Sequence, residues 1–120
     1  MAKYMLLLYV PPEARGAEAR ESGAAATLDD WFAYTDELEQ AGAFVASDAL
    51  QPIDAATTVR VRDAETLITD GPFAETKEML GGYYLIDVPD LDAALAWAAK
   101  VPNAPYGSVE VRPIMEFERS

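Results

Sequence analysis

The residues best suited to chemistry lie at positions 70–78, in the stretch DGPFAETKE. Asp70 follows a short apolar run and precedes Gly71-Pro72, a pair that forms stiff turns because glycine tolerates unusual φ angles and proline fixes φ. A carboxylate at such a corner is a candidate general base, provided that burial or neighbouring negative charge raises its pKa. Lys77 is then one candidate for stabilising an oxyanion.

The same stretch also has a purely structural interpretation. Asp70, Glu75, Lys77 and Glu78 fall within nine positions, and runs of charged residues usually belong to a solvated surface. In that interpretation Asp70 caps the turn, accepting hydrogen bonds from the backbone amides of residues 73–75.

A second group of charges lies on the last strand that the sequence predicts. Glu110 and Arg112 are two positions apart, so their side chains share one face of the strand and can pair. Enclosing two charges is costly unless they are well paired, so the pair indicates either a structural contact or an anion-binding guanidinium. Our hypothesis for a ligand site is a cleft formed by Asp70, Lys77, Glu78, Glu110 and Arg112.

Phenols form the other candidate set. They either donate hydrogen bonds into a ligand pocket, with Tyr83 as a ligand-binding residue, or they are core residues with a polar tip. Gly81-Gly82 is too short to be a phosphate-binding loop, and we predict no cofactor. The tyrosines in question are Tyr4, Tyr9, Tyr83, Tyr84 and Tyr106.

The composition excludes several classes of chemistry. The 120 residues contain neither His nor Cys, which excludes Ser-His-Asp triads, thiolate nucleophiles, disulfides and metal sites built on imidazole or thiolate. The net charge of −12 repels phosphate, so we expect neither nucleic acid nor an anionic membrane as a partner. The longest apolar run, residues 5–10, is far shorter than the roughly 20 residues of a membrane span, and we expect a cytoplasmic protein.

The first half of the chain predicts a strand, a loose segment and a helix. Residues 3–10 are apolar on both faces, as in a strand that is buried from both sides. Residues 13–26 show no apolar stripe and are interpreted as a loop with at most a loose helical turn. Thr27 and Asp30 resemble a capping box at the start of a helix that ends near Gly42. Its predicted apolar face consists of Leu28, Trp31, Phe32, Thr35 and Leu38.

The second half predicts more strands and one more helix. Residues 43–50 form a strand, and residues 57–62 and 66–69 form a hairpin that ends at Asp70. Residues 83–88 and 108–117 are two further strands, separated by a helix with Asp90 as its N-cap. The apolar face of that helix is predicted to be Leu91, Ala94, Leu95 and Ala98, with Trp97 at its rim.

This order predicts a single α+β domain, residues 1–120, with a ferredoxin-like split βαβ sandwich and an extra β-hairpin. Two helices can cover only one face of such a sheet. Because residues 3–10 and 83–88 are apolar on both faces, the second face also needs a cover. We therefore predict a homodimer in which two copies pack sheet against sheet.

The nonapeptide DGPFAETKE resembles the signature of the DGPF group in the YCII-related family. Further blocks resemble that group in the same order. The resemblance implies a dimeric α/β barrel and a context linked to extracytoplasmic-function sigma factors. Some relatives are thought to use a His–Asp pair as acid and base, and Asp70 matches the Asp although this chain has no His. The blocks are KYMLLLYV at 3–10, TTVRVR at 57–62, GGYYLIDVPDL at 81–91 and GSVEVRPI at 107–114.

Two functional hypotheses follow. The first is a homodimeric module that binds a small anionic or aromatic molecule, or a protein partner, in a pocket associated with the dimer. The alternative is an enzyme, hydrolase- or lyase-like, that uses Asp70 as a general acid or base on a small organic substrate. We favour the first, because without His or Cys a general base near neutral pH must be a carboxylate or a phenol.

Overall fold

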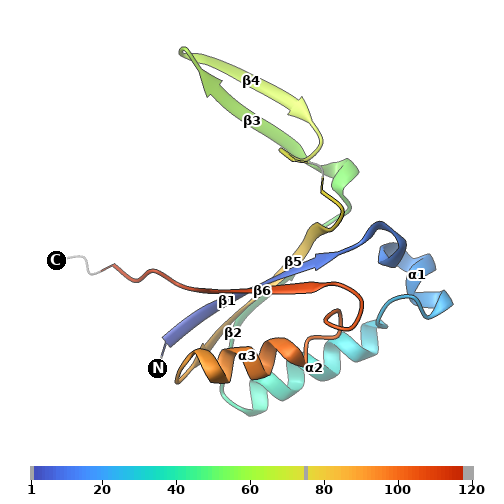
Figure 1. The fold of residues 1–120 in the computed structure, drawn as a ribbon, viewed down its shortest axis with the longest axis vertical. Coiled ribbons are helices and arrows are strands. Elements are labelled where there is room, and N and C mark those ends of the chain that lie inside the picture. Colours follow the sequence, from blue (N-terminus) through green and yellow to red (C-terminus); the bar gives the residue numbers. More distant parts are fainter. Residues whose placement is uncertain (1, 75, 118–120) are drawn as a thin grey trace.

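Strands and helices in this computed structural model, which describes residues 2–74 and 76–117, build a four-stranded antiparallel sheet and a separate hairpin (Figure 1). The strand order in the sheet is β2-β5-β1-β6. Its members are β1 (Ala2–Val10), β2 (Phe44–Ala49), β5 (Met79–Val88) and β6 (Ser108–Pro113). The predicted α+β, ferredoxin-like topology is confirmed, whereas the dimeric barrel stays a prediction.

The hydrophobic core lies between one face of this sheet and the helices α2 (Leu28–Gln40) and α3 (Leu91–Ala99). Alternate residues of β1 and β5 point into it, as the two-residue period of a strand requires. Burying each large aliphatic side chain here contributes roughly 1.5–3 kcal/mol. The fully buried side chains include Leu6 of β1, Leu38 of α2 and Ile86 of β5.

Helix α2 begins as the sequence predicts, but it turns a different face to the core. The Oγ1 of Thr27 accepts a hydrogen bond from the Asp30 amide, and Asp30 accepts one from the Thr27 amide, which confirms the capping box. The predicted apolar face is wrong in part, because Leu28 and Phe32 are 55% and 61% exposed. Tyr34 is buried instead, since its hydroxyl donates to the Trp97 carbonyl at 2.9 Å and leaves no polar atom unpaired.

Helix α3 shows a similar rotation. Asp90 accepts a hydrogen bond from the Ala93 amide at 2.9 Å, so the predicted N-cap is confirmed. The predicted apolar face is wrong at Leu91 and Leu95, both of which are exposed. Trp97 is half-buried and packs against the edge of the core, with the Lys100 ammonium over its ring, which is consistent with the predicted rim position.

The segment after β1 contains more structure than its sequence pattern indicates. A 3-10 turn, η1 (Pro12–Ala14), is followed by helix α1 (Gly16–Ser22). The interpretation of residues 13–26 as a loop is therefore wrong. Ala14 and Ala19 are buried here, and tertiary packing of this kind stabilises a helix too short to persist alone.

The hairpin consists of β3 (Thr57–Arg62) and β4 (Glu65–Asp70), which follow a second 3-10 turn, η2 (Ile53–Ala55). Asp63 and Ala64 have φ angles of 51° and 65°, as in the two-residue turns that match strand twist. Figure 1 shows the hairpin projecting away from the sheet, and all but one of its strand residues are exposed. A lone two-stranded hairpin is at best marginally stable in water, so this arm needs a surface to pack on.

The other face of the sheet has no helix over it within the described ranges. It carries Met5, Leu7 and Tyr9 of β1 and Leu85 of β5, all of them half-buried. The prediction that β1 is buried from both sides is therefore not met by a single chain. The last strand also ends earlier than predicted, at Pro113 rather than residue 117.

Replacing the N-cap of α2 tests how far this helix depends on its first turn. We expect Thr27→Ala to lower the free energy of unfolding by about 1 kcal/mol, because the Asp30 amide loses its acceptor. Thr27→Ser keeps that acceptor and serves as the control. Urea unfolding at one fixed protein concentration measures both variants, and equal midpoints would contradict a stabilising cap.

Candidate functional site

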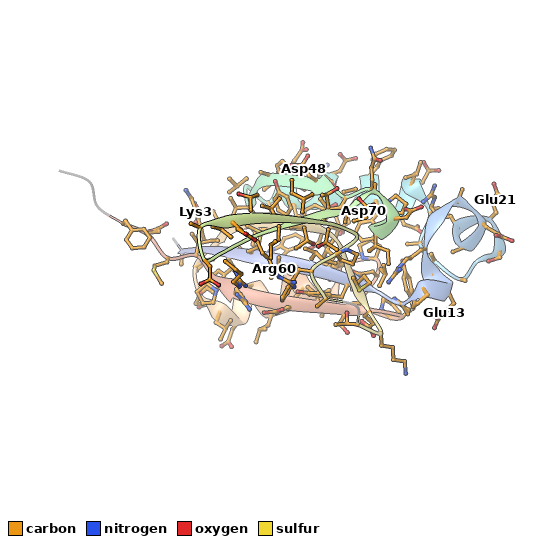
Figure 2. The ribbon with its side chains drawn as sticks, turned by 90° about the horizontal axis from the view of Figure 1, so that it is seen from above. Lys3, Glu13, Glu21, Asp48, Arg60 and Asp70 are labelled. Atoms are coloured by element: carbon orange, nitrogen blue, oxygen red, sulfur yellow. The ribbon has the colours of Figure 1, made fainter. Side chains whose placement is uncertain are left out.

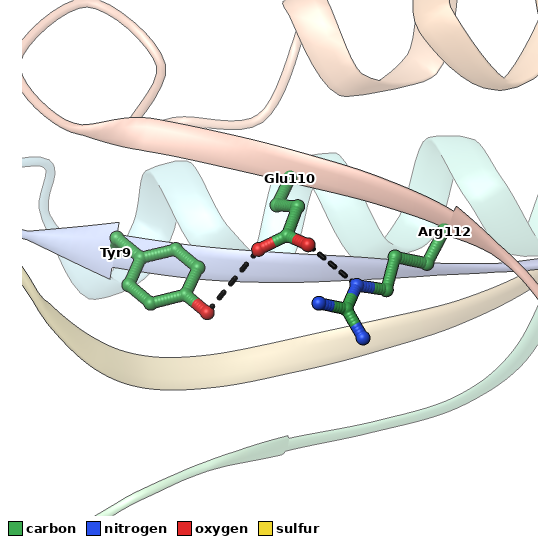
Figure 3. A network of polar contacts seen from close by, with 3 residues as sticks. All are labelled: Tyr9, Glu110 and Arg112. Atoms are coloured by element: carbon green, nitrogen blue, oxygen red, sulfur yellow. Dashed lines mark hydrogen bonds and ion pairs between the residues drawn. The ribbon is translucent and has the colours of Figure 1, made fainter.

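The pairing predicted for the last strand is present on the open face of the sheet (Figure 3). Arg112 Nε donates to Glu110 Oε2 at 2.5 Å, and the Tyr9 hydroxyl donates to Glu110 Oε1 at 3.3 Å. Burial, and then the negative charge of Glu110, raise the pKa of the Tyr9 phenol. In a single chain this network is largely exposed and adds little stability.

The other residues of the predicted cleft lie apart from this network. Glu78 accepts a hydrogen bond from the Ser108 hydroxyl at 2.8 Å. Asp70 (Figure 2) and Lys77 are exposed. Within the described ranges neither side chain makes a hydrogen bond or an ion pair. Glu75 lies outside the described residues. One chain thus does not join the five residues, and the site role of Asp70 stays a prediction that depends on a second chain.

The turn after Asp70 is held by backbone contacts rather than by its carboxylate. Gly71 has a φ of +96°, which a side chain would strain, and its amide donates to the Ala56 carbonyl at 2.7 Å. The Thr58 hydroxyl donates to the Gly71 carbonyl at 2.8 Å. These contacts fix the corner at which Asp70 sits and leave its carboxylate free of structural bonds among the described residues.

A cavity of about 460 Å³ lies elsewhere, on the helix-covered side of the sheet. Its volume falls in the range of roughly 300–1,000 Å³ that is typical of small-molecule sites. The walls come from the α1 segment, from α2 and from the adjoining ends of β1, β2 and β5. The apolar wall residues include Leu8, Val10, Leu28, Trp31, Phe32 and Met79. None of the five residues of the predicted charged cleft lines it, but three of the candidate tyrosines do: Tyr83, Tyr84 and Tyr106.

Local sequence explains why space remains here. Ala25 and Ala26 form a small-residue link between α1 and α2, and the Ala26 amide donates to the Tyr106 hydroxyl at 3.0 Å. Gly82 lets β5 approach β2 closely, because a Cβ at this position would lie 2.8 Å from the Asp48 carbonyl oxygen. Small residues in the link between the helices and at Gly82 therefore contribute to the space at this end of the sheet.

Tyr84 turns its phenol to the helix-covered side, whereas Tyr83 and Asp48 pair across the strands with their side chains on the open face, so neither phenol serves the cavity as a base. Tyr84 and Thr35 share a hydrogen bond of 2.7 Å, and the Tyr83 hydroxyl donates to Asp48 at 2.7 Å. Burial raises the pKa of Tyr84, and the hydrogen bond to Asp48 raises that of Tyr83. Both phenols thus stay protonated at neutral pH, and the cavity is equipped for binding rather than for proton abstraction.

Two arginines line the same cavity, Arg15 before α1 and Arg20 within it. Arg15 donates from Nη2 to the Val10 carbonyl at 3.3 Å, while its Nε is buried and has no partner within residues 2–74 and 76–117. Asn103 is fully buried and also reaches the cavity, and its Oδ1 is likewise unpaired there. The sequence analysis missed these residues. Its only signal was two cations in a segment that we interpreted as a loop.

Neither a metal centre nor a membrane segment emerges from the described residues. No group of three or more acidic, His or Cys side chains in them has an arrangement that could hold a metal ion. No helix in this part of the chain is long and apolar enough to cross a bilayer.

Comparison with known proteins identifies the family of the chain. The family model of the YCII-related domain matches residues 2–118. An uncharacterised protein of Rhizobium meliloti (strain 1021), R00369, is 40% identical over 117 residues, which cover 96% of this chain and 94% of that protein. The chain therefore belongs to the YCII-related family.

The buried phenols predict how stability changes at high pH. A raised folded-state pKa means that the unfolded chain loses its phenol proton first, so stability is retained below pH 10 and falls as the pH rises above it. Urea midpoints measured at pH 8 and at about pH 11 should show this fall. Tyr84→Phe should reduce the fall without abolishing it, because burial also raises the pKa of Tyr34. An unchanged fall in the variant would contradict a perturbed Tyr84.

Proposed function

We propose that this YCII-related chain is a homodimeric module that binds a small organic molecule in the cavity beneath α2. The observation that carries the proposal is a cavity of about 460 Å³ with mainly apolar walls and a few convergent polar groups. Sites of this construction orient a ligand by those polar groups and bind it by apolar contact. The absence of His and Cys, and phenols that stay protonated, favour binding over turnover.

The open face of the sheet supports the dimer. Met5, Leu7 and Leu85 would expose apolar surface on a face that no helix in the described ranges covers. A second copy is the occupant that fits, because the face carries its own paired charges, Glu110 and Arg112, and buried ions are tolerated when paired. The second copy of the chain would also supply a surface on which the projecting hairpin can pack.

The dimer and the cavity are connected through the segments that carry the hairpin. Residues 50–53 lead toward it and residues 79–82 lead away from it, and both stretches line the cavity. Leu50 and Leu80 are exposed there in a single chain. Packing of the hairpin on a partner would therefore fix the cavity wall, which makes this a pocket associated with the dimer.

An enzyme that uses Asp70 is the alternative. It requires the dimer to enclose Asp70 and to place a cation within about 3–5 Å of its carboxylate, because only burial and nearby charge can tune that group for acid–base work. The observation in its favour is a carboxylate on a rigid corner without structural bonds among the described residues. A crystal structure of the dimer with Asp70 open to water would exclude it. A regulatory role beside a sigma factor is compatible with a binding module and is suggested by the family resemblance alone.

A charge placed on the open face tests the dimer. We expect Leu7→Glu to give a monomer in light scattering at micromolar concentration, since an unpaired carboxylate in an apolar interface is strongly unfavourable. Leu95→Glu is the matched control, because Leu95 is an exposed leucine on the outer side of α3. A monomeric wild type, or an equal loss of mass in both variants, would contradict this interface.

Filling the cavity tests the binding site. Ala25→Trp places a large side chain at the cavity wall, whereas Ala24→Trp places it at an exposed neighbour outside the wall. We expect Ala25→Trp to abolish the thermal shifts that a panel of small aromatic and aliphatic metabolites produces in the wild type. We expect Ala24→Trp to retain them. If no compound shifts the wild type, and native mass spectrometry finds no co-purified molecule, the binding function is wrong.

A further inference from the structure

We infer that the ligand of this cavity is an organic carboxylate with an apolar body, and that Arg15 binds its charged group. The inference rests on the proposed function, because it assigns the ligand class of the same cavity. It comes from the charge balance of the cavity wall, from an unpaired buried donor and from the apolar surfaces that surround them.

The charge balance at the cavity is opposite to that of the whole chain. The chain has 21 acidic and nine basic residues, so negative charge dominates the molecule as a whole. Within the described ranges the ion pairs join Lys100 to Glu37 and Arg112 to Glu110, and none involves Arg15 or Arg20. The cavity wall therefore contains two arginines that form no ion pair with the described residues.

One carboxylate, Asp48, is also among the residues of the wall. It already accepts the hydroxyl hydrogen of Tyr83 at 2.7 Å, and no ion pair within the described ranges links it to either arginine. The Asp48 side chain lies with Tyr83 on the open face of the sheet, so the two arginines leave an excess of positive charge at the cavity, inside a chain of net charge −12. This excess selects anionic ligands over cationic ones.

The geometry of Arg15 identifies it as the anion-binding group. Its Nη2 is fixed by the Val10 carbonyl at 3.3 Å, while its Nε–H is buried without an acceptor among the described residues. A buried donor that lacks a partner is unfavourable, and a guanidinium presents a planar fork that matches a carboxylate. Arg15 is half-buried and lines the cavity, so a ligand carboxylate there can pair with the outer edge of its guanidinium, which the contact with Val10 holds in place.

The remaining walls favour an apolar, flat body. Trp31 lines the cavity and stacks on Tyr84 with an interplanar angle of 10°, and Leu28 and Phe32 of α2 extend the same apolar surface. An aromatic acid fits this combination better than a phosphate ester, which would need more donors than one fixed guanidinium supplies.

Three probes with the same phenyl group and different charge test the inference: phenylacetate, phenylacetamide and phenethylamine. Isothermal titration of the wild-type protein should show phenylacetate binding about tenfold or more tightly than the neutral amide, with the amine weakest. Arg15→Gln should remove the preference for the acid over the amide. Arg15→Lys should retain part of it, because it keeps the charge and loses the fork.

Arg62→Gln is the matched control, since Arg62 lies at the hairpin tip and donates to the Val61 carbonyl. It removes the same charge and should leave the preference unchanged. If the acid and the amide bind the wild type equally, the inference is overturned while the binding function stands. If none of the three probes binds, the inference is also overturned, and the metabolite panel and native mass spectrometry decide the binding function separately. The comparison in the wild type decides the matter even if Arg15→Gln does not fold.

Discussion

The four-stranded sheet has apolar side chains on both faces, but the described helices cover only one of them. Leu6 and Ile86 are fully buried beneath α2 and α3, whereas Leu7 and Leu85, their neighbours in sequence, remain half-buried on the other side. Strand residues alternate between faces, so the helices that cover Leu6 and Ile86 cannot also cover Leu7 and Leu85. This imbalance is the constraint from which the proposed dimer follows.

The projecting hairpin also carries apolar side chains that the described residues of its own chain do not cover. A two-stranded ribbon has no interior, so residues such as Val59 and Ile68 remain exposed however well the ribbon is hydrogen-bonded. Its turn and register are well specified, and the corner at Asp70 is rigid. The hairpin is thus a formed structure that lacks a packing surface within its own chain, and a partner chain would supply one.

The chemistry available to the chain is narrow. With no imidazole and no thiol, the groups that could move a proton near neutral pH are carboxylates and phenols. The phenols of Tyr83 and Tyr84 have raised pKa values and act as donors, and the one carboxylate at the cavity wall, Asp48, is engaged by Tyr83. The arginines at the same wall are permanent cations. A cavity with this inventory recognises a ligand by charge and shape.

The sequence by itself determined the features that depend on neighbouring residues. These are the capping box at Thr27, the N-cap at Asp90, the hairpin, the Glu110–Arg112 pair and the order of elements, because each depends on groups only a few positions apart or on a regular period. The absence of His and Cys, and the resemblance to the YCII-related family, were also evident from the sequence. Only the tertiary structure decided which faces of α2 and α3 are buried, since Tyr34 becomes a core residue through the carbonyl of Trp97, 63 positions away. It alone brought α1 to the end of the sheet, because a helix that short is stabilised by what it packs against, and the cavity arises from that placement.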